Sequence, residues 1–447
     1  MDLHKGETFW HQTGKEADYL TMSKDDQAEV VIVGAGMTGA LIAYELLKDN
    51  HTVVLLDKGV PGYGSSDGNT GIIQYNSDDS LKEMIEEHGE QRAVDFYRMS
   101  IEGITLLHQI AGELKEDVGY APKNSLYLCS REEHEPGLRK KYETLKKYDF
   151  PAALINREAL MQEYSLKAFG AMKTPLDLEL NPFKWIQAVH RSNLARGARV
   201  YKDVEVIDVV SDGQGSFIVQ TKSGFRVTTK FVIYAIGYAE KVIPEVEPLV
   251  ERNSTFSVVT EITNTFWGER ALIWDSADPY LYFHSTDDDR VIAGGRDKEG
   301  TKLNSQERID HENEQILARV KDYFPAFKAE PYTMWQSVFA ESKDGLPFID
   351  KRKTEENQYF ALAYGGNGTC YAAIAAILLR SYLRGEEHPY AYTVALKRYQ
   401  VPKRQLKKAK LETTQRQRTS GMGRRSADMV PGTDSSGADS IPYPESP

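Results

Sequence analysis

A glycine-rich hexapeptide, GAGMTG, is the first segment whose composition and spacing indicate chemistry. It follows the apolar run VVIV and precedes a stretch with helical spacing, which is the strand–turn–helix context of a dinucleotide-binding site. In that context Gly34 allows the tight turn, Gly36 lets the backbone approach a pyrophosphate, and Gly39 lets helix and strand pack closely. Met37 and Thr38 lie at the start of the helix expected over 38–48, whose N–H groups and positive dipole end would face the phosphates.

An acidic residue at the end of the next apolar strand supports the same interpretation. The run TVVLL is followed directly by Asp57 and Lys58, and Asp57 comes 23 residues after Gly34. A carboxylate there can accept hydrogen bonds from ribose hydroxyls, whereas it would repel the 2′-phosphate of NADP. The order strand, turn, helix, strand and acid therefore predicts a dinucleotide fold, which at this point suits either NAD or FAD. We include both residues in the predicted cofactor site.

A run of small polar residues, GVPGYGSSDGNTGIIQ, follows this acid. Such residues let a backbone approach a ligand closely, and their hydroxyl and amide groups can hydrogen-bond to phosphates and ring heteroatoms. Here the chain resembles the D-amino-acid oxidase, glycine oxidase and sarcosine oxidase (DAO) family of flavoenzymes. The resemblance implies that FAD is the cofactor, with Ser65 and Ser66 at its phosphates and with Asn69, Thr70, Gly71 and Ile72 nearer the flavin ring.

Three later segments agree with this resemblance. RGARVYKDVEVIDV resembles the strand pair whose backbone meets the adenine, with Val204 at the matching position. FVIYAIG resembles the family strand that ends beside the cofactor at Ala235 and Gly237, although Ile236 stands where Thr is usual. DGLPFID and YGGNG resemble the return of the chain to the flavin, which implies a ring edge lined by Tyr364, Gly365, Gly366, Asn367, Gly368 and Thr369. The next helix would point its positive end at the ring and stabilise the anionic reduced flavin.

The resemblance covers residues 29 to 385 and implies an α/β fold that is α+β overall. In this fold a Rossmann-like FAD-binding domain carries an inserted, mostly antiparallel β-sheet substrate domain. We expect a discontinuous FAD-binding domain and a substrate domain after an N-terminal arm: the arm is 1–28, the FAD-binding domain is 29–115 with 171–253 and 341–385, and the substrate domain is 116–170 with 254–340. No second strand–GxGxxG–helix unit occurs, so a separate NAD(P)H domain is not expected.

The reaction implied by the resemblance is oxidation of a C–N bond of a small amine or amino acid. In the family a hydride passes from the substrate to the flavin N5, an imine forms, and oxygen or another acceptor then takes the electrons. We place the substrate between the flavin and the second sheet, where the candidate catalytic residues are Tyr282, His284, Phe339 and Glu341, with Tyr280 and Trp335 nearby. Core packing of the aromatic side chains and a structural hydrogen bond at His284 are the alternatives.

One segment departs from the amino-acid oxidases of the family. Many of them place an arginine shortly before the DG-x-P segment, where its planar fork can clamp the substrate carboxylate. This chain reads SVFAESKDGLP, with Phe339 and Glu341 in that region and Lys343 as the nearby cation. Our hypothesis is that Glu341 orients a cationic amine, so that the substrate is an amine or polyamine derivative. A structural salt bridge of Glu341 is the alternative.

The chain contains two cysteines, Cys129 and Cys370, in 447 residues. Their separation argues against a disulfide framework or a metal site and fits a reducing compartment. The covalent flavin link of some sarcosine oxidases needs a cysteine near the C-terminal segment. Cys370, however, follows GGNG at the start of a helix and is expected to be buried. We therefore expect FAD to be bound non-covalently.

Hydrophobic periodicity outlines the elements that must position these residues. We expect strands at 30–33, 52–56, 125–129, 201–209, 216–222 and 231–237, followed by an antiparallel set from 254 to 295. Helices are expected at 38–48, 89–111, 182–200, 305–323 and 370–384. The first 28 residues are predicted to form an irregular arm, with Phe9 and Trp10 docked on the body.

Charge and hydropathy exclude several classes of function. The formal net charge of −11 argues against nucleic acid as the main partner. The longest apolar run, AAIAAILL, is too short for a transmembrane segment, and the polar N-terminus does not read as a signal peptide. A cytoplasmic protein is expected. The tail at 401–447 is basic at first and then rich in Gly, Ser, Pro and Asp, so we expect it to be disordered.

Two other functions are compatible with these patterns. An NAD-dependent dehydrogenase would be favoured if the GNTG and YGGNG segments were ordinary loops. A flavin-binding redox or sensor protein without turnover is the second alternative, because the sequence shows no obvious substrate clamp.

Overall fold

The computed structural model describes residues 2–237, 243–353 and 355–400, without the side chain of Gln400. The chain forms two compact units, Met1–Leu396 and Lys397–Pro447. All the sheets described below belong to the first unit. The second unit is described only over residues 397–400, which are 3-10 helical. The tail predicted at 401–447 lies outside the described residues.

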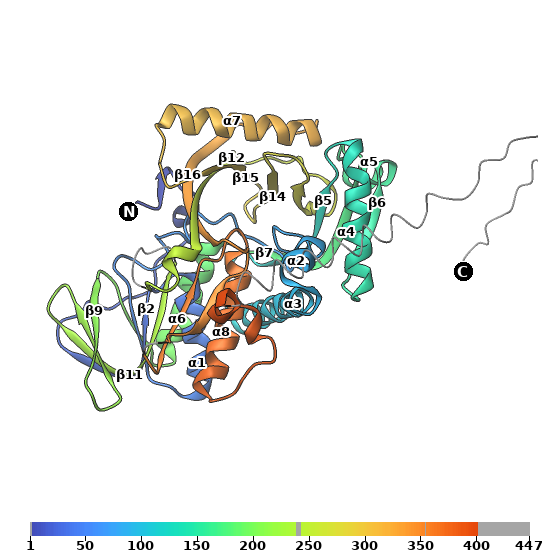
Figure 1. Ribbon diagram of the computed structural model, residues 1–447. Coiled ribbons are helices and arrows are strands. Elements are labelled where there is room, and N and C mark those ends of the chain that lie inside the picture. The colour runs from blue at the N-terminus through green and yellow to red at the C-terminus, as the bar shows by residue number, and fades with distance from the viewer. Residues whose placement is uncertain (1, 238–242, 354, 401–447) are drawn as a thin grey trace, which may run out of the picture. The chain divides into compact units, whose positions relative to one another are not determined.

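A mostly parallel sheet positions the glycine-rich turn (Figure 1). Its strands are, in order, β17 (Phe348–Lys351), β18 (Gln358–Leu362), β11 (Arg226–Gly237), β2 (Asp26–Val33), β3 (Val53–Leu56) and β8 (Arg199–Tyr201), and a hairpin of β9 (Val206–Ser211) and β10 (Phe217–Thr221) pairs with β11. The five strands from β18 to β8 run parallel. The run from Val30 to Ile32 is fully buried. Val30 and Ile32 point into the apolar cluster that includes the helices described next, whereas Val31 points to the opposite face of the sheet.

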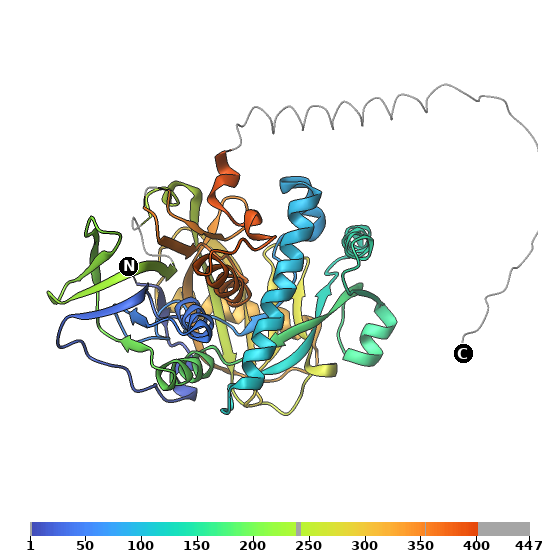
Figure 2. The ribbon, with the colours of Figure 1, turned by 90° about the horizontal axis from the view of Figure 1, so that it is seen from below.

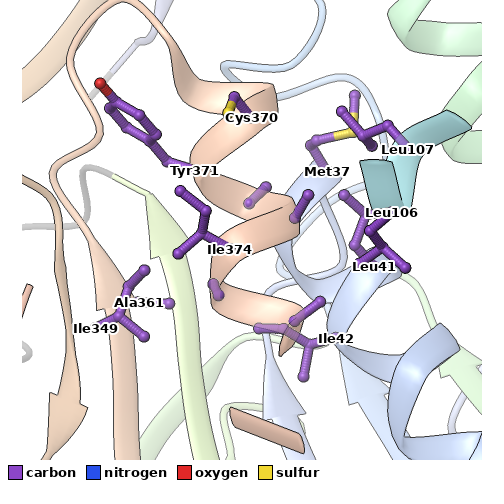
Figure 3. Packing of buried hydrophobic residues seen from close by; sticks show 14 of the residues in the cluster. Met37, Leu41, Ile42, Leu106, Leu107, Ile349, Ala361, Cys370, Tyr371 and Ile374 are labelled. Atoms are coloured by element: carbon purple, nitrogen blue, oxygen red, sulfur yellow. The ribbon is translucent and has the colours of Figure 1, made fainter. Parts of the chain in front are cut away.

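Four helices build the core around this sheet. They are α1 (Met37–Leu46), α3 (Glu90–Glu113), α6 (Pro182–Ala195) and α8 (Gly368–Leu383). α8 packs between α1 and α3, and Figure 3 shows Leu41 of α1, Leu107 of α3 and Ile374 of α8 in one apolar cluster. α8 is rich in Ala and buried over most of its length, which suits a helix enclosed by neighbours.

A larger sheet of ten strands lies within the described residues. Its strands are, in order, β1 (His4–Gly6), β16 (Pro331–Ser342), β12 (Val250–Thr260), β15 (Val291–Glu299), β14 (Leu281–Ser285), β13 (Leu272–Asp275), β5 (Ala121–Leu128), β7 (Gly170–Glu179) and β4 (Ile72–Ile73), and β6 (Ala153–Asn156) also pairs with β7. All pairs are antiparallel except β13 with β5. The predicted combination of a parallel and a mostly antiparallel sheet is therefore confirmed.

The two faces of the larger sheet have different partners. α7 (Gln306–Tyr323) lies along one face (Figure 1), where its Ile316 and Val320 share a buried cluster with Phe283 of β14. Because neighbouring residues of a strand point to opposite faces, Tyr282 and His284 lie on the face away from α7. The register of the strands therefore determines which polar side chains reach the site described below.

The remaining helices are α2 (Leu81–His88), α4 (Glu135–Lys147) and α5 (Arg157–Tyr164). Figure 2 shows α3 as the long helix that runs beside α8. None of the helices in the described part of the chain has the length and apolar character needed to cross a membrane.

The N-terminal arm is partly regular, and the expectation of a wholly irregular arm over 1–28 was wrong. His4–Gly6 is an edge strand on β16, and β2 already begins at Asp26. The predicted docking of Phe9 and Trp10 is confirmed, because both are buried beside Trp335. This aromatic anchor brings the polar HKG segment to an unpaired sheet edge, where backbone hydrogen bonds form whatever the side chains are.

The division into a FAD-binding and a substrate domain stays a proposal. β7 and the start of β12, which that division placed in the FAD-binding domain, belong to the larger sheet. The same is true of β4 and of the last two residues of β16.

Candidate functional site

The glycine-rich turn joins β2 to α1, and its three glycines have separate steric roles. A Cβ on Gly34, whose φ is +99°, would lie 2.3 Å from the carbonyl oxygen of Ala235. A Cβ on Gly39 would lie 2.0 Å from the carbonyl oxygen of Gly34, so this glycine permits close packing of helix and strand. A Cβ on Gly36 would lie 3.2 Å from Ser66 Oγ and would project beside a cavity.

Asp57 organises the end of β3. Its Oδ2 accepts a hydrogen bond from the backbone N–H of Ala35 at 2.7 Å, and its Oδ1 accepts one from that of Gly59 at 3.0 Å. The backbone carbonyl of Asp57 also accepts from the N–H of Val204 at 2.7 Å. The predicted ribose acid is therefore fixed against both the glycine-rich turn and the segment predicted to meet the adenine.

A cavity of about 660 Å³ opens at the carboxyl ends of β2, β3 and β11, where open α/β sheets bind ligands. This volume lies in the range of about 300–1,000 Å³ that is usual for ligand pockets. The predicted cofactor residues that line it are Gly34, Gly36, Met37, Thr38, Asp57, Lys58, Ser65, Ser66, Asn69, Val204, Ala235, Gly237, Tyr364, Gly368 and Thr369. The fold thus brings segments from four distant parts of the sequence around one space.

Two helices begin at this cavity. Neither α1 nor α8 is capped by the side chain of its N-cap residue, which is Gly36 in α1 and Asn367 in α8. The Asn367 amide instead donates to the carbonyl oxygens of Gln74 at 2.6 Å and Asn76 at 3.1 Å. Both helix starts can therefore present backbone N–H groups and positive dipole ends to an anionic ligand.

The segment from Asn69 to Ile72 is held from behind by other parts of the chain. Asn69 Nδ2 donates to Thr369 Oγ1 at 3.2 Å, and the Gly71 N–H donates to Asn69 Oδ1 at 2.7 Å. The indole N–H of Trp10 donates to the Asn69 carbonyl oxygen at 2.5 Å. Of this segment Asn69 lines the cavity, whereas Thr70, Gly71 and Ile72 are not among the lining residues. Their predicted contact with the flavin stays a prediction.

Three further predicted residues, Gly365, Gly366 and Asn367, also lie outside the cavity lining. The Gly365 N–H donates to the carbonyl oxygen of Ala340 at 2.9 Å and so attaches the segment to β16. A Cβ on Gly366 would lie 2.7 Å from Asp78 Oδ2. The segment is thus enclosed by carboxylate-bearing strands and loops, a feature that the sequence did not reveal.

Several lining residues were missed. Leu3 of the arm, Val206–Val209 of β9 and Arg352 also line the cavity. β9 begins two residues after Val204, so the predicted adenine segment could have been extended along the chain. Leu3 and Arg352 carry no local signal, because their positions depend on the pairing of β1 with β16 and of β17 with β18.

The residues present fit a flavin dinucleotide. The lining runs from β9 past the start of α1 to the first turn of α8, which are the places predicted for adenine, pyrophosphate and flavin. The side of Gly36 that faces this space is open only because the residue has no Cβ. Hydroxyl and amide groups of Ser65, Ser66 and Asn69 stand along the lining as hydrogen-bonding partners.

Three carboxyl groups cluster beside the Gly365–Gly366 turn. Asp78 adjoins Gly366, and a Cβ on Gly365 would lie 3.6 Å from the Cβ of Glu341. Burial, with repulsion from Asp78 and Asp297, raises the pKa of Glu341 to about 7. Burial, with repulsion from Asp297, raises the pKa of Asp78 to about 6. Asp78 and Asp297 are thus electrostatic neighbours of Glu341, and Lys298 is the cation beside Asp297. A positive ligand next to Glu341 would stabilise its ionised form.

The environment of Glu341 is polar on one side. Its Oε1 accepts a hydrogen bond from Asn253 Nδ2 at 2.5 Å. Glu341 forms no ion pair within the described residues, so the structural salt bridge that was the alternative for this residue is not seen there. Tyr280 and Tyr282 stand near the cluster with ring centroids 5.8 Å apart. Burial and the neighbouring Asp297 raise the pKa of Tyr282 to about 12, which keeps its hydroxyl protonated.

The other candidate catalytic residues have different surroundings. His284 is buried, and both its ring nitrogens contact protein oxygen atoms. Phe339 is partly buried on β16, opposite Asn253 of β12. Trp335 belongs to a buried aromatic cluster, which matches the core-packing alternative. The structure thus groups Tyr280, Tyr282 and Glu341 around the carboxyl cluster and separates Trp335 from them.

Comparisons with known proteins agree with this architecture. A family model described as FAD dependent oxidoreductase (DAO) matches residues 29–381. The chain is 24% identical over 390 residues to glycine oxidase from Geobacillus kaustophilus, which covers 80% of this chain and 93% of that protein. It is 23% identical over 420 residues to gamma-glutamylputrescine oxidoreductase from Escherichia coli, which covers 90% of this chain and 94% of that protein.

Solved structures show the same fold. The crystal structure of glycine oxidase from Geobacillus kaustophilus matches with a TM-score of 0.71 at 21% identity, over 81% of this chain and 96% of that chain. L-proline dehydrogenase from P. horikoshii matches with a TM-score of 0.70 at 18% identity, over 84% of this chain and 98% of that chain. At these identities the likeness establishes the arrangement of the two sheets.

Proposed function

The chain belongs to the DAO family of FAD-dependent oxidoreductases, whose model matches residues 29–381, and on this basis we propose that it oxidises a C–N bond of a small cationic amine to an imine. When bound, FAD supplies the acceptor for the two electrons that leave this bond. Oxygen or another acceptor then takes the electrons. The membership supports the reaction class, and the substrate class is inferred from the residues of this chain.

The observation that carries the substrate class is the position of Glu341. It lies at the end of β16, beside the Gly365–Gly366 turn, with Asp78 and Asp297 as electrostatic neighbours. The stretch before DGLP contains no arginine. A substrate carboxylate placed here would be repelled, whereas an ammonium group would be attracted. The cluster therefore favours an amine over an amino acid.

Glu341 can also act as a proton acceptor. Asn253 occupies Oε1, which leaves Oε2 to receive a proton from a bound ammonium group. Loss of that proton frees the nitrogen lone pair that C–N oxidation requires. A pKa of about 7 suits this role, because a proton acceptor works best when its pKa lies near the working pH.

We assign the cavity to FAD on the pattern of its lining. Val204 would meet the adenine and Asp57 the ribose. The pyrophosphate would lie against Gly36, Met37, Thr38, Ser65 and Ser66, and the flavin edge against Tyr364, Gly368 and Thr369. The attachment is proposed to be non-covalent, because Cys370 is fully buried in the core cluster (Figure 3) and because Cys129, which is also buried, is absent from the lining.

The relatives support two substrate classes. The name gamma-glutamylputrescine oxidoreductase refers to an amine derivative, and the alignment with that relative covers 90% of the present chain. Glycine oxidase and L-proline dehydrogenase are named for amino acids, so an amino acid is the second candidate. A flavin-binding protein without turnover is the third.

An anaerobic screen tests the proposal. The flavin absorbance of the purified protein is followed with matched pairs of substrates, such as a diamine and its mono-acylated derivative, and with glycine, proline and other amino acids. Bleaching by amines, with slower or no bleaching by amino acids, is the expected result. Bleaching only by amino acids would overturn the amine assignment, and no bleaching by either class would favour a protein without turnover.

A further inference from the structure

His284 is enclosed by hydrogen-bond acceptors. It lies on β14 with 1% of its side chain exposed. Its Nε2 is 2.7 Å from the backbone carbonyl oxygen of Thr70, and its Nδ1 is 3.0 Å from Glu179 Oε2 on β7. With both nitrogens occupied, the imidazole cannot take a proton from a substrate. The role of His284 must therefore be sought in the two groups that it binds.

The two hydrogen bonds determine how many protons the ring carries. A carbonyl oxygen can only accept, so Nε2 must donate to Thr70. A neutral imidazole would then turn the lone pair of Nδ1 toward Glu179, where it would face an oxygen atom with no proton between them. Both contacts are satisfied when a proton lies between Nδ1 and Glu179 Oε2. If Nδ1 carries this proton the ring is an imidazolium cation, and if Oε2 carries it the ring is neutral.

Lys123 completes a chain of charges. Its Nζ lies 3.2 Å from Glu179 Oε1, and the exposed fractions of the two side chains are 12% and 9%. A carboxylate at Glu179 can accept from Lys123 at Oε1 and from His284 at Oε2 together. Lys123, Glu179 and His284 then carry the charges +1, −1 and +1, so the chain has a net charge of +1.

The chain of charges adjoins a segment that reaches the cofactor cavity. Thr70 follows Asn69, which lines the cavity and donates to Thr369 in the first turn of α8. The same segment is tied to β7 by the pairing of Ile72 with Glu179. His284 is therefore hydrogen-bonded to the residue that directly follows Asn69 of the cavity lining.

We propose that His284 is an imidazolium that positions the Asn69–Thr70 segment and that the positive chain formed with Glu179 and Lys123 favours the reduced state of bound FAD. Reduction adds negative charge to the flavin, and a buried cation nearby stabilises that charge. His284 is thus a positioning residue. The inference rests on FAD binding and is independent of which substrate the protein oxidises.

Three variants test the count of charges through the midpoint potential of bound FAD. His284→Gln and Lys123→Met each reduce the net charge from +1 to 0, and both are expected to lower the potential. Glu179→Gln makes His284 neutral but leaves the net charge at +1, because the new amide can donate to Nδ1. Its potential is expected to stay closer to the wild-type value than that of His284→Gln, because one positive charge remains, although it then lies on Lys123.

A neutral His284 gives the opposite pattern. The wild-type chain would then have no net charge, so Glu179→Gln would raise the potential and His284→Gln would leave it unchanged. Either of these two results would overturn the proposal.

A second measurement uses the FAD-free protein and therefore does not depend on turnover. In ¹⁵N-histidine-labelled protein, the resonances absent from His284→Gln are expected to show a directly bound proton on both ring nitrogens at pH 7. A single protonated nitrogen would refute the imidazolium. The FAD dissociation constant of His284→Gln is expected to rise about tenfold, which corresponds to the loss of one hydrogen bond to a charged donor.

Discussion

Glu341 and Tyr364 face each other in an antiparallel bridge that joins the end of β16 to the segment before α8. The adjacent hydrogen bond from the Gly365 N–H to the Ala340 carbonyl oxygen measures 2.9 Å. These backbone contacts hold the carboxylate of Glu341 at a constant position relative to residues that line the cofactor cavity. The proposed cation site and the proposed flavin edge are therefore parts of one structural unit, although Glu341 and Tyr364 are 23 positions apart in the sequence.

Replacement of Glu341 by Gln tests whether its carboxylate binds a cationic amine. The substitution keeps the shape of the side chain but removes the charge that an ammonium group would meet. A hydrogen bond to a charged group contributes about 1.5–3 kcal/mol, so kcat/KM for a cationic amine should fall by roughly 10- to 150-fold. Glu299→Gln, at an exposed end of β15, is the matched control and should retain wild-type kinetics. Steady-state kinetics of the wild type and of the two variants measure the change in kcat/KM. An unchanged KM of Glu341→Gln for every accepted substrate would end the hypothesis.

The pH dependence of KM should report the same carboxyl group. Below pH 7 Glu341 is largely the neutral acid, because burial and Asp78 raise its pKa to about 7. As the pH rises through 7 the carboxylate forms and can pair with an ammonium group, so KM for a cationic amine should fall. The Glu341→Gln variant should lose this inflection near pH 7. A KM profile of the wild type that is flat or that rises from pH 6 to 8 would contradict the assignment.

The glycine-rich turn offers a test that separates folding from FAD binding. Gly36→Ala places a methyl group beside the cavity without backbone strain, because Gly36 has a φ of −72°. We expect FAD affinity to fall about tenfold or more, a change of about 1.4 kcal/mol, with little change in the thermal stability of the FAD-free protein. Gly34→Ala meets the Ala235 carbonyl oxygen and a φ of +99°, which costs about 1–3 kcal/mol in backbone strain alone. In thermal melts of the FAD-free proteins, Gly34→Ala should therefore lose stability and Gly36→Ala should not. In FAD titrations, Gly36→Ala should show the weaker binding despite its normal stability.

The attachment of FAD can be tested by acid precipitation. Cys370 is fully buried and its Sγ lies 3.5 Å from the carbonyl oxygen of Ser100. Burial also raises the pKa of this thiol far above its ordinary value, which disfavours the reactive thiolate. We expect the flavin absorbance to pass wholly into the supernatant, both for the wild type and for Cys370→Ala. Flavin that stays with the precipitate of the wild type but not of the variant would show a covalent bond at this cysteine.

The parallel part of the fold could be predicted because its signals are local. VVIV, the three glycines and Asp57 stand close together in the chain, and strand, turn and helix each follow from short-range patterns. The helix predicted at 182–200 was too long, because α6 ends at Ala195 and Arg199–Tyr201 forms strand β8. The helices predicted at 89–111 and 305–323 correspond to α3 and α7. Their ends differ by one or two residues, as hydrogen bonds at helix ends depend on neighbouring segments. The chemical roles of the predicted residues stay predictions.

The fold class, the family and most segments around the cavity can be read from the amino-acid sequence alone, because each depends on a short pattern or on the order of patterns. That Asp78 and Asp297 are neighbours of Glu341, and that His284 lies between Glu179 and Thr70, follows only from how the chain folds. These groups come from strands and loops far apart in the chain, and no spacing in the sequence relates them. Their meeting depends on strand register and on which face of the larger sheet each side chain occupies, because a shift of one residue would turn the same side chains toward α7.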